Sequence, residues 1–191
     1  MTQAAPGAVV DEAVRARIWD LLEQVFDPEI PVISLPDLGV VREVRHGDAG
    51  WEVVITPTYS GCPAMEQMAD DIVAAMAAAG LSVQVRTQLA PAWTTDWMSA
   101  AGRRKLREYG IAPPVARVGA VRAGEGASPA PASASERVLR FLPRATTPDR
   151  VACPRCGAPE TVQVAQFGST ACKAQYRCLA CREPFDYFKP L

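Results

Sequence analysis

The sequence has little of what most enzymes and membrane proteins need. Its single histidine, His46, is expected at the solvated tip of a hairpin, so there is no Ser-His-Asp triad to nominate. The sequence has neither a Walker-type phosphate loop nor a Gly-x-Gly-x-x-Gly fingerprint. The longest uncharged apolar stretch, 72–81, is too short to cross a membrane, and residues 1–10 lack the features of a signal peptide. We therefore expect a cytoplasmic protein with no membrane partner and no recognisable catalytic machinery.

An excess of charge of one sign is also lacking. The 20 Lys and Arg residues nearly balance the 21 Asp and Glu residues, for a net charge of −1. Such a balance gives no electrostatic basis for binding nucleic acid or an anionic membrane surface. The basic residues Arg155, Lys173, Arg177 and Arg182 keep a nucleic-acid-binding ribbon open as an alternative, but we do not expect nucleic acid to be a partner.

Four of the six cysteines form two Cys-x-x-Cys pairs, Cys153 with Cys156 and Cys178 with Cys181. A cytosolic protein keeps its thiols reduced, so these pairs indicate metal ligands rather than disulfides. Two residues between paired cysteines let both sulfurs point at one centre, and two pairs supply the four thiolates of a closed tetrahedral site. The pattern predicts a structural Zn²⁺ ion, with iron as the alternative that the same thiolates would accept.

The residues around these cysteines, 150–191, are predicted to form a small β zinc ribbon. About 40 residues are too few for an independent core, so the metal is expected to supply the free energy of folding. Apolar and aromatic residues of this segment are expected to pack beneath the metal: Val162, Val164, Phe167, Tyr176, Phe185, Tyr187 and Phe188.

The front of the chain, residues 9–111, is predicted to form a larger domain. Hydrophobic spacing predicts a helix, two strands, a helix, a strand and a helix, in this order: 14–25, 40–44, 51–56, 65–76, 83–89 and 95–109. The α-β-β-α-β-α order predicts an α+β fold of two layers, with the helices on one face of a three-stranded sheet. Residues 112–149 are rich in Pro, Ala and Ser and are predicted to be a linker.

Cys62 is the lone cysteine of the front domain. It lies between a predicted strand and a predicted helix, and Pro63 suits the first helical position. Free backbone N–H groups and the helix dipole at such a place would lower the pKa of the thiol, which would make Cys62 a nucleophile or a soft metal ligand. The alternative, a small apolar residue in a tight turn, is equally consistent with the residues alone.

Three further residues are weaker candidates. Cys172 lies outside the ligand pairs, and it is expected to be either a small buried residue or an exposed thiol activated by Lys173. Asp27 and Glu29 place two carboxylates in a proline-rich loop, where ordinary turn chemistry is the alternative explanation.

Several motifs in order resemble the iron–sulfur assembly domain family that includes SufT. In the front domain these are residues 27–31, 37–41 and 58–64. The tail motifs at 167–174 and 178–189, together with the segment at 91–98, resemble one branch of the family, PaaD, also called PaaJ. The resemblance covers both predicted domains, with Cys62, Asp27 and Glu29 on the positions of the shared motifs.

The resemblance implies an accessory role in the phenylacetyl-CoA epoxidase system of phenylacetate degradation. Members of this branch are associated with maturation of metal centres, so the implied partners are the oxygenase and reductase subunits and the iron–sulfur assembly machinery. The implied cargo is transient iron or an iron–sulfur cluster. Because a cluster usually takes four thiolates and the front domain has one, the others would come from a second subunit in a homodimer, from small thiols or from partner cysteines.

Two other functions stay open at this point. A non-catalytic structural subunit of the oxygenase would form a stoichiometric complex and tolerate loss of Cys62. A thiol enzyme using Cys62, with or without Cys172, would need a lowered thiol pKa.

Overall fold

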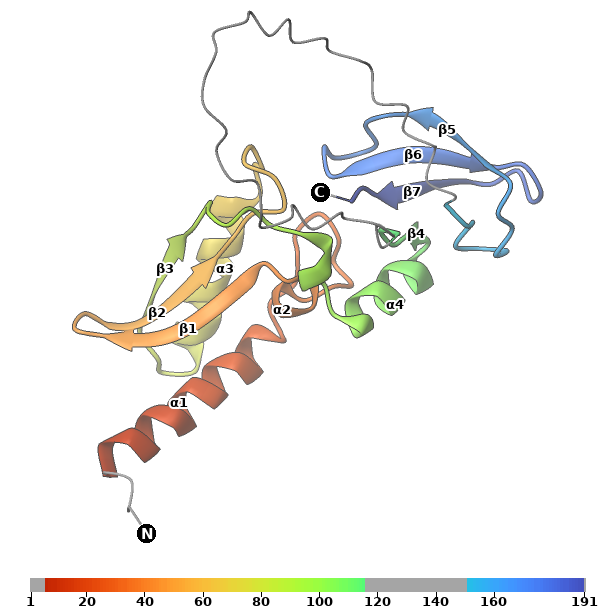
Figure 1. Ribbon diagram of the computed structural model, residues 1–191. Coiled ribbons are helices and arrows are strands. Elements are labelled where there is room, and N and C mark those ends of the chain that lie inside the picture. Colours follow the sequence, from red (N-terminus) through yellow and green to blue (C-terminus); the bar gives the residue numbers. More distant parts are fainter. Residues whose placement is uncertain (1–5, 116–150, 191) are drawn as a thin grey trace, which may run out of the picture.

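The computed structural model describes residues 6–115 and 151–190, and it contains two β-sheets, one from each end of the chain (Figure 1). Most of the predicted linker, 112–149, lies outside the described residues. Every helix in the described ranges is too short or too polar to cross a membrane.

The front domain has the predicted α+β fold. Its strands β1 (Val41–Gly47), β2 (Gly50–Ile55) and β3 (Val83–Thr87) form a three-stranded sheet in the order β1-β2-β3. The first pair is antiparallel and the second parallel, because helix α3 (Met65–Ala78) makes the crossover between β2 and β3. Helix α1 (Pro6–Leu22) contacts both α3 and β1, so the helices and the sheet form two layers (Figure 1).

The core of this domain lies between the helices and the sheet. Helix positions predicted from their spacing, Ile18 and Leu22 in α1 and Ile72 and Met76 in α3, are fully buried. Burial of each such side chain contributes about 1.5–3 kcal/mol, which makes this layer the main source of the domain's stability.

The β1–β2 connection is the predicted hairpin. Gly47 pairs with Gly50, and Gly50 has a φ of 101°, a left-handed conformation that favours glycine. His46 is exposed near this turn, with its ring centroid 5.0 Å from that of Trp51. The single histidine is therefore a surface residue remote from the loop of Cys62.

Between the sheet and the second domain the structure corrects the predicted helix at 95–109. A 3₁₀ helix, η1 (Thr95–Trp97), is followed by a separate helix, α4 (Ala100–Tyr109). The break falls at Ser99, which has an extended backbone and caps α4 by accepting a hydrogen bond from the N–H of Gly102 at 2.8 Å. A short helix, α2 (Leu35–Leu38), was not predicted because four residues carry no periodic signal.

The second sheet is the ribbon. Strands β5 (Thr161–Ala165), β6 (Lys173–Cys178) and β7 (Pro184–Phe188) are antiparallel neighbours. A two-residue strand from the front of the chain, β4 (Ile111–Ala112), pairs in parallel with β7 and completes the order β4-β7-β6-β5. Residues on both sides of the predicted boundary at 111 thus join the ribbon sheet, which ties the two parts of the chain together directly after α4 (Figure 1).

Candidate functional site

The four ribbon cysteines converge on one point. Cys153 and Cys156 lie in the turn before β5, and Cys178 ends β6, with Cys181 in the turn that follows. Their sulfur atoms all lie within 4.8 Å of one another, with 3.8 Å between Cys153 and Cys181 and 3.6 Å between Cys156 and Cys178. A tetrahedron with metal–sulfur bonds of about 2.3 Å has edges of about 3.8 Å, so the geometry fits a four-coordinate zinc.

The pKa values of two of the four thiols, Cys178 and Cys181, are shifted in opposite directions. A hydrogen bond from the N–H of Cys181 is the main cause that lowers the pKa of Cys178 to about 7. The N–H of Glu183 lowers the pKa of Cys181, but burial and the sulfurs of Cys178, Cys156 and Cys153 outweigh it and raise that pKa to about 12. Four thiols at this spacing can all ionise only when a central positive charge offsets the repulsion between the thiolates.

The predicted packing beneath the metal is correct in part. Tyr176, Phe185 and Tyr187 are buried in a small cluster with Cys153 and Cys178. By contrast, β5 is an edge strand whose side chains face solvent, and the exposed apolar residues of the ribbon are Val162, Val164, Phe167 and Leu179. The prediction failed for β5 because alternation alone does not say which face of a strand is covered.

Phe188 leaves the ribbon core and packs against the front domain. It is 1% exposed, it belongs to the hydrophobic core of the front domain, and its ring centroid is 5.9 Å from that of Trp93. Cys172, in the turn immediately before β6, is 6% exposed and belongs to the same core. These two residues fasten the ribbon to the front domain.

Cys172 is thereby brought to the loop that carries Cys62. Cys62 is half-buried two residues before the N-cap of α3, and its thiol interacts electrostatically with Glu29, Asp27 and Cys172. The hydroxyl of Tyr59 also interacts electrostatically with Cys62, Glu29 and Cys172. We call the set Asp27, Glu29, Cys62, Cys172 and Lys173 the junction cluster.

The two thiols of the junction cluster have raised pKa values. For Cys62, burial is the main cause of the rise. The N–H of Ala64 donates a hydrogen bond that lowers the pKa, and the neighbouring carboxylates of Glu29 and Asp27 raise it further. Burial likewise raises the pKa of Cys172, against a lowering hydrogen bond with Thr170 whose oxygen lies 3.0 Å from the sulfur. The predicted lowering for Cys62 is wrong, because burial and nearby negative charge outweigh the N–H groups before α3. The small-buried-residue interpretation of Cys172 is correct, and the exposed thiol is not.

The carboxylate of Asp27 is held by its own loop. Asp27 is buried, and its Oδ1 accepts hydrogen bonds from the N–H groups of Glu29 and Ile30, both at 2.8 Å. Burial raises the pKa of Asp27, while burial and the charge of Asp27 raise that of Glu29. Lys173 opposes both shifts: its side chain is 5% exposed, and its Nζ lies 3.9 Å from Asp186. The sequence places Lys173 beside Cys172 but not beside Asp27 and Glu29, because only the docked ribbon brings it to their loop.

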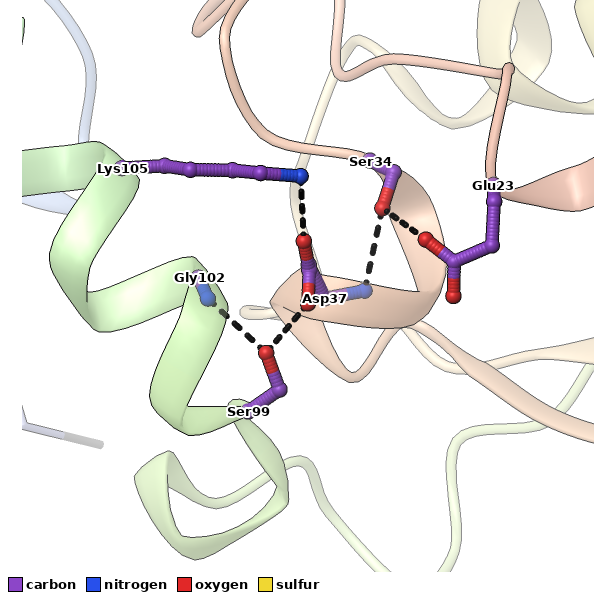
Figure 2. A network of polar contacts seen from close by, with 6 residues as sticks. All are labelled: Glu23, Ser34, Asp37, Ser99, Gly102 and Lys105. Carbon is purple, nitrogen blue, oxygen red and sulfur yellow. Dashed lines mark hydrogen bonds and ion pairs between the residues drawn. The ribbon is translucent and has the colours of Figure 1, made fainter.

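Asp37, the first residue of the motif at 37–41, is a structural joint between α2 and the α4 region. Asp37 accepts a hydrogen bond from the hydroxyl of Ser99 and forms an ion pair of 2.6 Å with Lys105, and both partners belong to the α4 region (Figure 2). On the other side Ser34 caps α2 and donates to Glu23 at 2.9 Å. Burial alone would raise the pKa of Asp37, but the hydrogen bonds from Lys105 and Ser99 hold it below its ordinary value. Because its oxygens are engaged in this way, Asp37 orients α4 and the adjoining β4.

Comparison with known families assigns a class to each half of the chain. Residues 15–86 match the family model described as iron-sulfur cluster assembly protein, and residues 142–189 match the PaaD zinc beta ribbon domain. The fold and the two sites therefore define an iron–sulfur assembly type of protein with a zinc ribbon attached.

Curated relatives identify the family more closely. A protein of Escherichia coli K12, named as one component of a "Putative 1,2-phenylacetyl-CoA epoxidase", is 49% identical over 90% of this chain and 90% of its own length. The chain belongs to the PaaD family. The front half is also similar to the Fe-S protein maturation auxiliary factor YitW of Bacillus subtilis, with 33% identity over 47% of this chain and 90% of that protein.

Solved structures similar to the front domain include a domain of unknown function, DUF59, from Bacillus anthracis. It is 25% identical, covers 52% of this chain and 96% of its own, and has a TM-score of 0.48. Rv1466 from Mycobacterium tuberculosis, described as associated with [Fe-S] complex assembly and repair, is 30% identical over 58% of this chain and 94% of its own, with a TM-score of 0.30.

Proposed function

We propose that this protein is an accessory protein of the phenylacetyl-CoA epoxidase system in phenylacetate degradation, where it matures the iron–sulfur cluster or another metal centre of the oxygenase or its reductase. The observation that carries the proposal is the position of Cys62 beside Asp27 and Glu29 in an assembly-type domain, with the ribbon docked against it. Cytoplasm, where thiols stay reduced, is the proposed location.

Each part of the chain has a separate role in this proposal. The front domain, residues 9–111, handles the cargo through Cys62, and the ribbon, residues 150–191, holds a structural zinc at Cys153, Cys156, Cys178 and Cys181 and docks the client. Residues 112–149 link them. The protein has no catalytic site of its own, and its partners are the oxygenase and reductase subunits and the iron–sulfur assembly machinery.

A non-catalytic structural subunit is the second candidate, and one observation favours it. The ribbon exposes Val162, Val164, Phe167 and Leu179, and exposed apolar side chains on so small a module suit a stable protein contact. This function needs no thiol, so it is distinguished by its indifference to Cys62.

The test is co-expression of the reductase subunit with this protein, with its Cys62→Ala variant, with a Ser60→Ala control, and with none. Ser60 is exposed on the same loop, so this control alters the loop without touching the thiol. Iron and acid-labile sulfide in the purified reductase are the readout. Maturation predicts full cluster content with wild type and Ser60→Ala, and low content with Cys62→Ala and with no partner. Equal content in all four overturns maturation for this client.

A further inference from the structure

A polar cleft lies between the ribbon sheet and the end of α4. Its volume is about 440 Å³, and residues of β6 and β7 line it from the ribbon, while Tyr109 and Gly110 line it from the end of α4. Glu29 enters it from the front domain and Arg155 from the first zinc turn. Of the residues that the structure describes, neither the four ribbon cysteines nor Cys62 lines this cleft, so the zinc and the proposed cargo chemistry leave it without a role.

The strand register shows which face of the ribbon sheet borders the cleft. Lys173 and Gln175 are two residues apart in β6 and point to the same face, and Asp186 of β7 pairs directly with Gln175. Ala174, between them, points to the opposite face and belongs to the core beneath the zinc. Next to Lys173 the cleft face is covered, because its partner Phe188 belongs to the front-domain core, whereas Gln175 is exposed. The cleft is therefore the open part of a face that the front domain otherwise covers.

Lys173 brings a buried cation without a hydrogen bond to this cleft. Its side chain is 5% exposed, and Oδ2 of Asp186 lies 3.9 Å from its Nζ, beyond hydrogen-bonding distance. That oxygen instead accepts a hydrogen bond from the hydroxyl of Ser169 at 3.4 Å. Within residues 6–115 and 151–190 the ammonium donates no hydrogen bond. Three buried N–H donors without acceptors cost free energy, and an acceptor bound in the cleft offsets that cost.

The charges that line the cleft limit what it can bind. Lys173 and Arg155 are its cations, and Glu29 and Asp186 are its carboxylates, so the two signs balance. Arg155 is exposed, and a Cβ added at Gly110 would lie 3.5 Å from its Nη2, which places the guanidinium beside the end of α4. A doubly charged phosphate group would add excess negative charge next to the two carboxylates. A single carboxylate accompanied by N–H donors suits all four side chains.

We infer that the cleft binds an acidic segment of a client protein. A carboxylate side chain of that segment accepts hydrogen bonds from the Lys173 ammonium and the Arg155 guanidinium, while main-chain N–H groups of the segment donate to Asp186 and Glu29. The inference rests on the proposed function, in which the ribbon docks the client, and it adds the chemistry of the docked segment. Because Arg155 belongs to the first zinc turn, loss of the metal also removes this contact.

The experiment is an amide NMR titration of the zinc-loaded, full-length protein with two blocked peptides. One is acetyl-Gly-Ala-Glu-Ala-Gly-amide, and its match has Gln in place of Glu. The Glu peptide should shift the amides of Ile111, Gln175 and Asp186. It should bind about tenfold more tightly than the Gln peptide, because its carboxylate makes charge-assisted hydrogen bonds that an amide cannot make. Added salt should weaken the Glu peptide more than the Gln peptide.

Three variants and one control locate the bound carboxylate. Arg155→Gln and Lys173→Met each remove one cation, and Gln175→Glu adds a carboxylate that competes for Lys173. Each should weaken binding of the Glu peptide by about tenfold. Arg104 is exposed on α4 and does not line the cleft, so Arg104→Gln should bind as wild type does. Arg155 and Gln175 are exposed, so their variants test the site even where loss of the buried Lys173 disturbs the docking of the ribbon.

The outcomes separate this inference from the proposed function. Equal binding of the two peptides, no shift with either, or wild-type binding by Arg155→Gln and Gln175→Glu would overturn the acidic-segment site, while the co-expression test would still decide on maturation. Selective binding of the Glu peptide, together with equal cluster content in all four co-expressions, would keep the site and assign it to a structural contact with a partner subunit.

Discussion

The two groups of cysteines differ in how many coordination positions on a metal ion their sulfurs could fill. The ribbon site has four sulfurs at the spacing of a tetrahedron, which fills every position on a zinc ion. The junction cluster has two sulfurs, that of the buried Cys172 and that of the half-buried Cys62, with the carboxylates of Asp27 and Glu29 nearby. A closed set of ligands keeps its metal and stabilises the fold, whereas an incomplete set can release metal to a partner that supplies the remaining ligands. In the proposed function the same residue type therefore has two tasks, because its surroundings differ.

The largest expected effect is loss of the ribbon metal. Structural zinc contributes about 10–16 kcal/mol to the folding of small modules, so Cys178→Ser or strong chelation should unfold β5 to β7. The front domain should keep its helices, because Ile18, Leu22, Ile72 and Met76 are buried in α1 and α3, which pack on each other and on the front sheet. Amide NMR spectra with zinc analysis provide the measurement, and Cys62→Ser is the matched control. A ribbon that stays folded without metal would contradict the closed-site account.

Separation of the two domains is the next effect in size. Phe188→Ala removes a 1% exposed ring that packs on Trp93 and should cost about 3–5 kcal/mol of docking and folding free energy. Cys172 should then react faster with iodoacetamide. The exposed Phe167 provides the control, because Phe167→Ala should change stability by no more than about 0.5 kcal/mol. An unchanged labelling rate for Cys172 in Phe188→Ala would show that the docking does not bury it.

The Asp37 joint should give a smaller, pH-dependent effect. Its pKa is held below the ordinary value, so its contribution is present above the unfolded pKa of about 3.9 and is lost as the pH falls through the folded value. Asp37→Asn should lower the free energy of unfolding at pH 7 by about 1–3 kcal/mol and flatten its acid dependence. Urea unfolding at pH 7 and at acidic pH measures this. An acid profile as steep as that of wild type would assign the dependence to other groups.

The smallest effect concerns the reactivity of Cys62. Because burial and the carboxylates raise its pKa, alkylation at pH 7 should be slower than that of a free cysteine peptide, and its rate should still be rising above pH 9. Mass spectrometry of the peptide containing Cys62 follows the reaction, with Cys62→Ala as the blank. A rate that levels off near neutral pH would instead support the thiol-enzyme alternative.

The sequence was sufficient for features that depend on local spacing. Two Cys-x-x-Cys pairs predict one tetrahedral site because a tight turn fixes both sulfurs, and the structure places all four together. The α-β-β-α-β order of the front domain followed from apolar periodicity, since Ile18 and Ile72 lie on buried helical faces.

Features that depend on long-range contact could not be predicted. The neighbourhood of Cys62 and Cys172 arises because Phe188 and β4 dock the ribbon on the front domain. The direction of the Cys62 pKa shift depends on long-range contact too, because the local chain offers the N–H of Ala64 while the folded chain adds burial and the charges of Glu29 and Asp27. A thiol placed just before a helix therefore ionises readily only when burial and the neighbouring charges also permit it.

One measurement tests the difference between the two sites most directly: X-ray absorption at the zinc and iron edges on the same anaerobic, Fe²⁺-loaded protein. We predict zinc surrounded by four sulfurs at about 2.3 Å, and iron with a mixture of sulfur and lighter ligands. Iron with four sulfurs would place it in the ribbon, and iron with no sulfur ligand would exclude Cys62 as its ligand; either result would contradict the account.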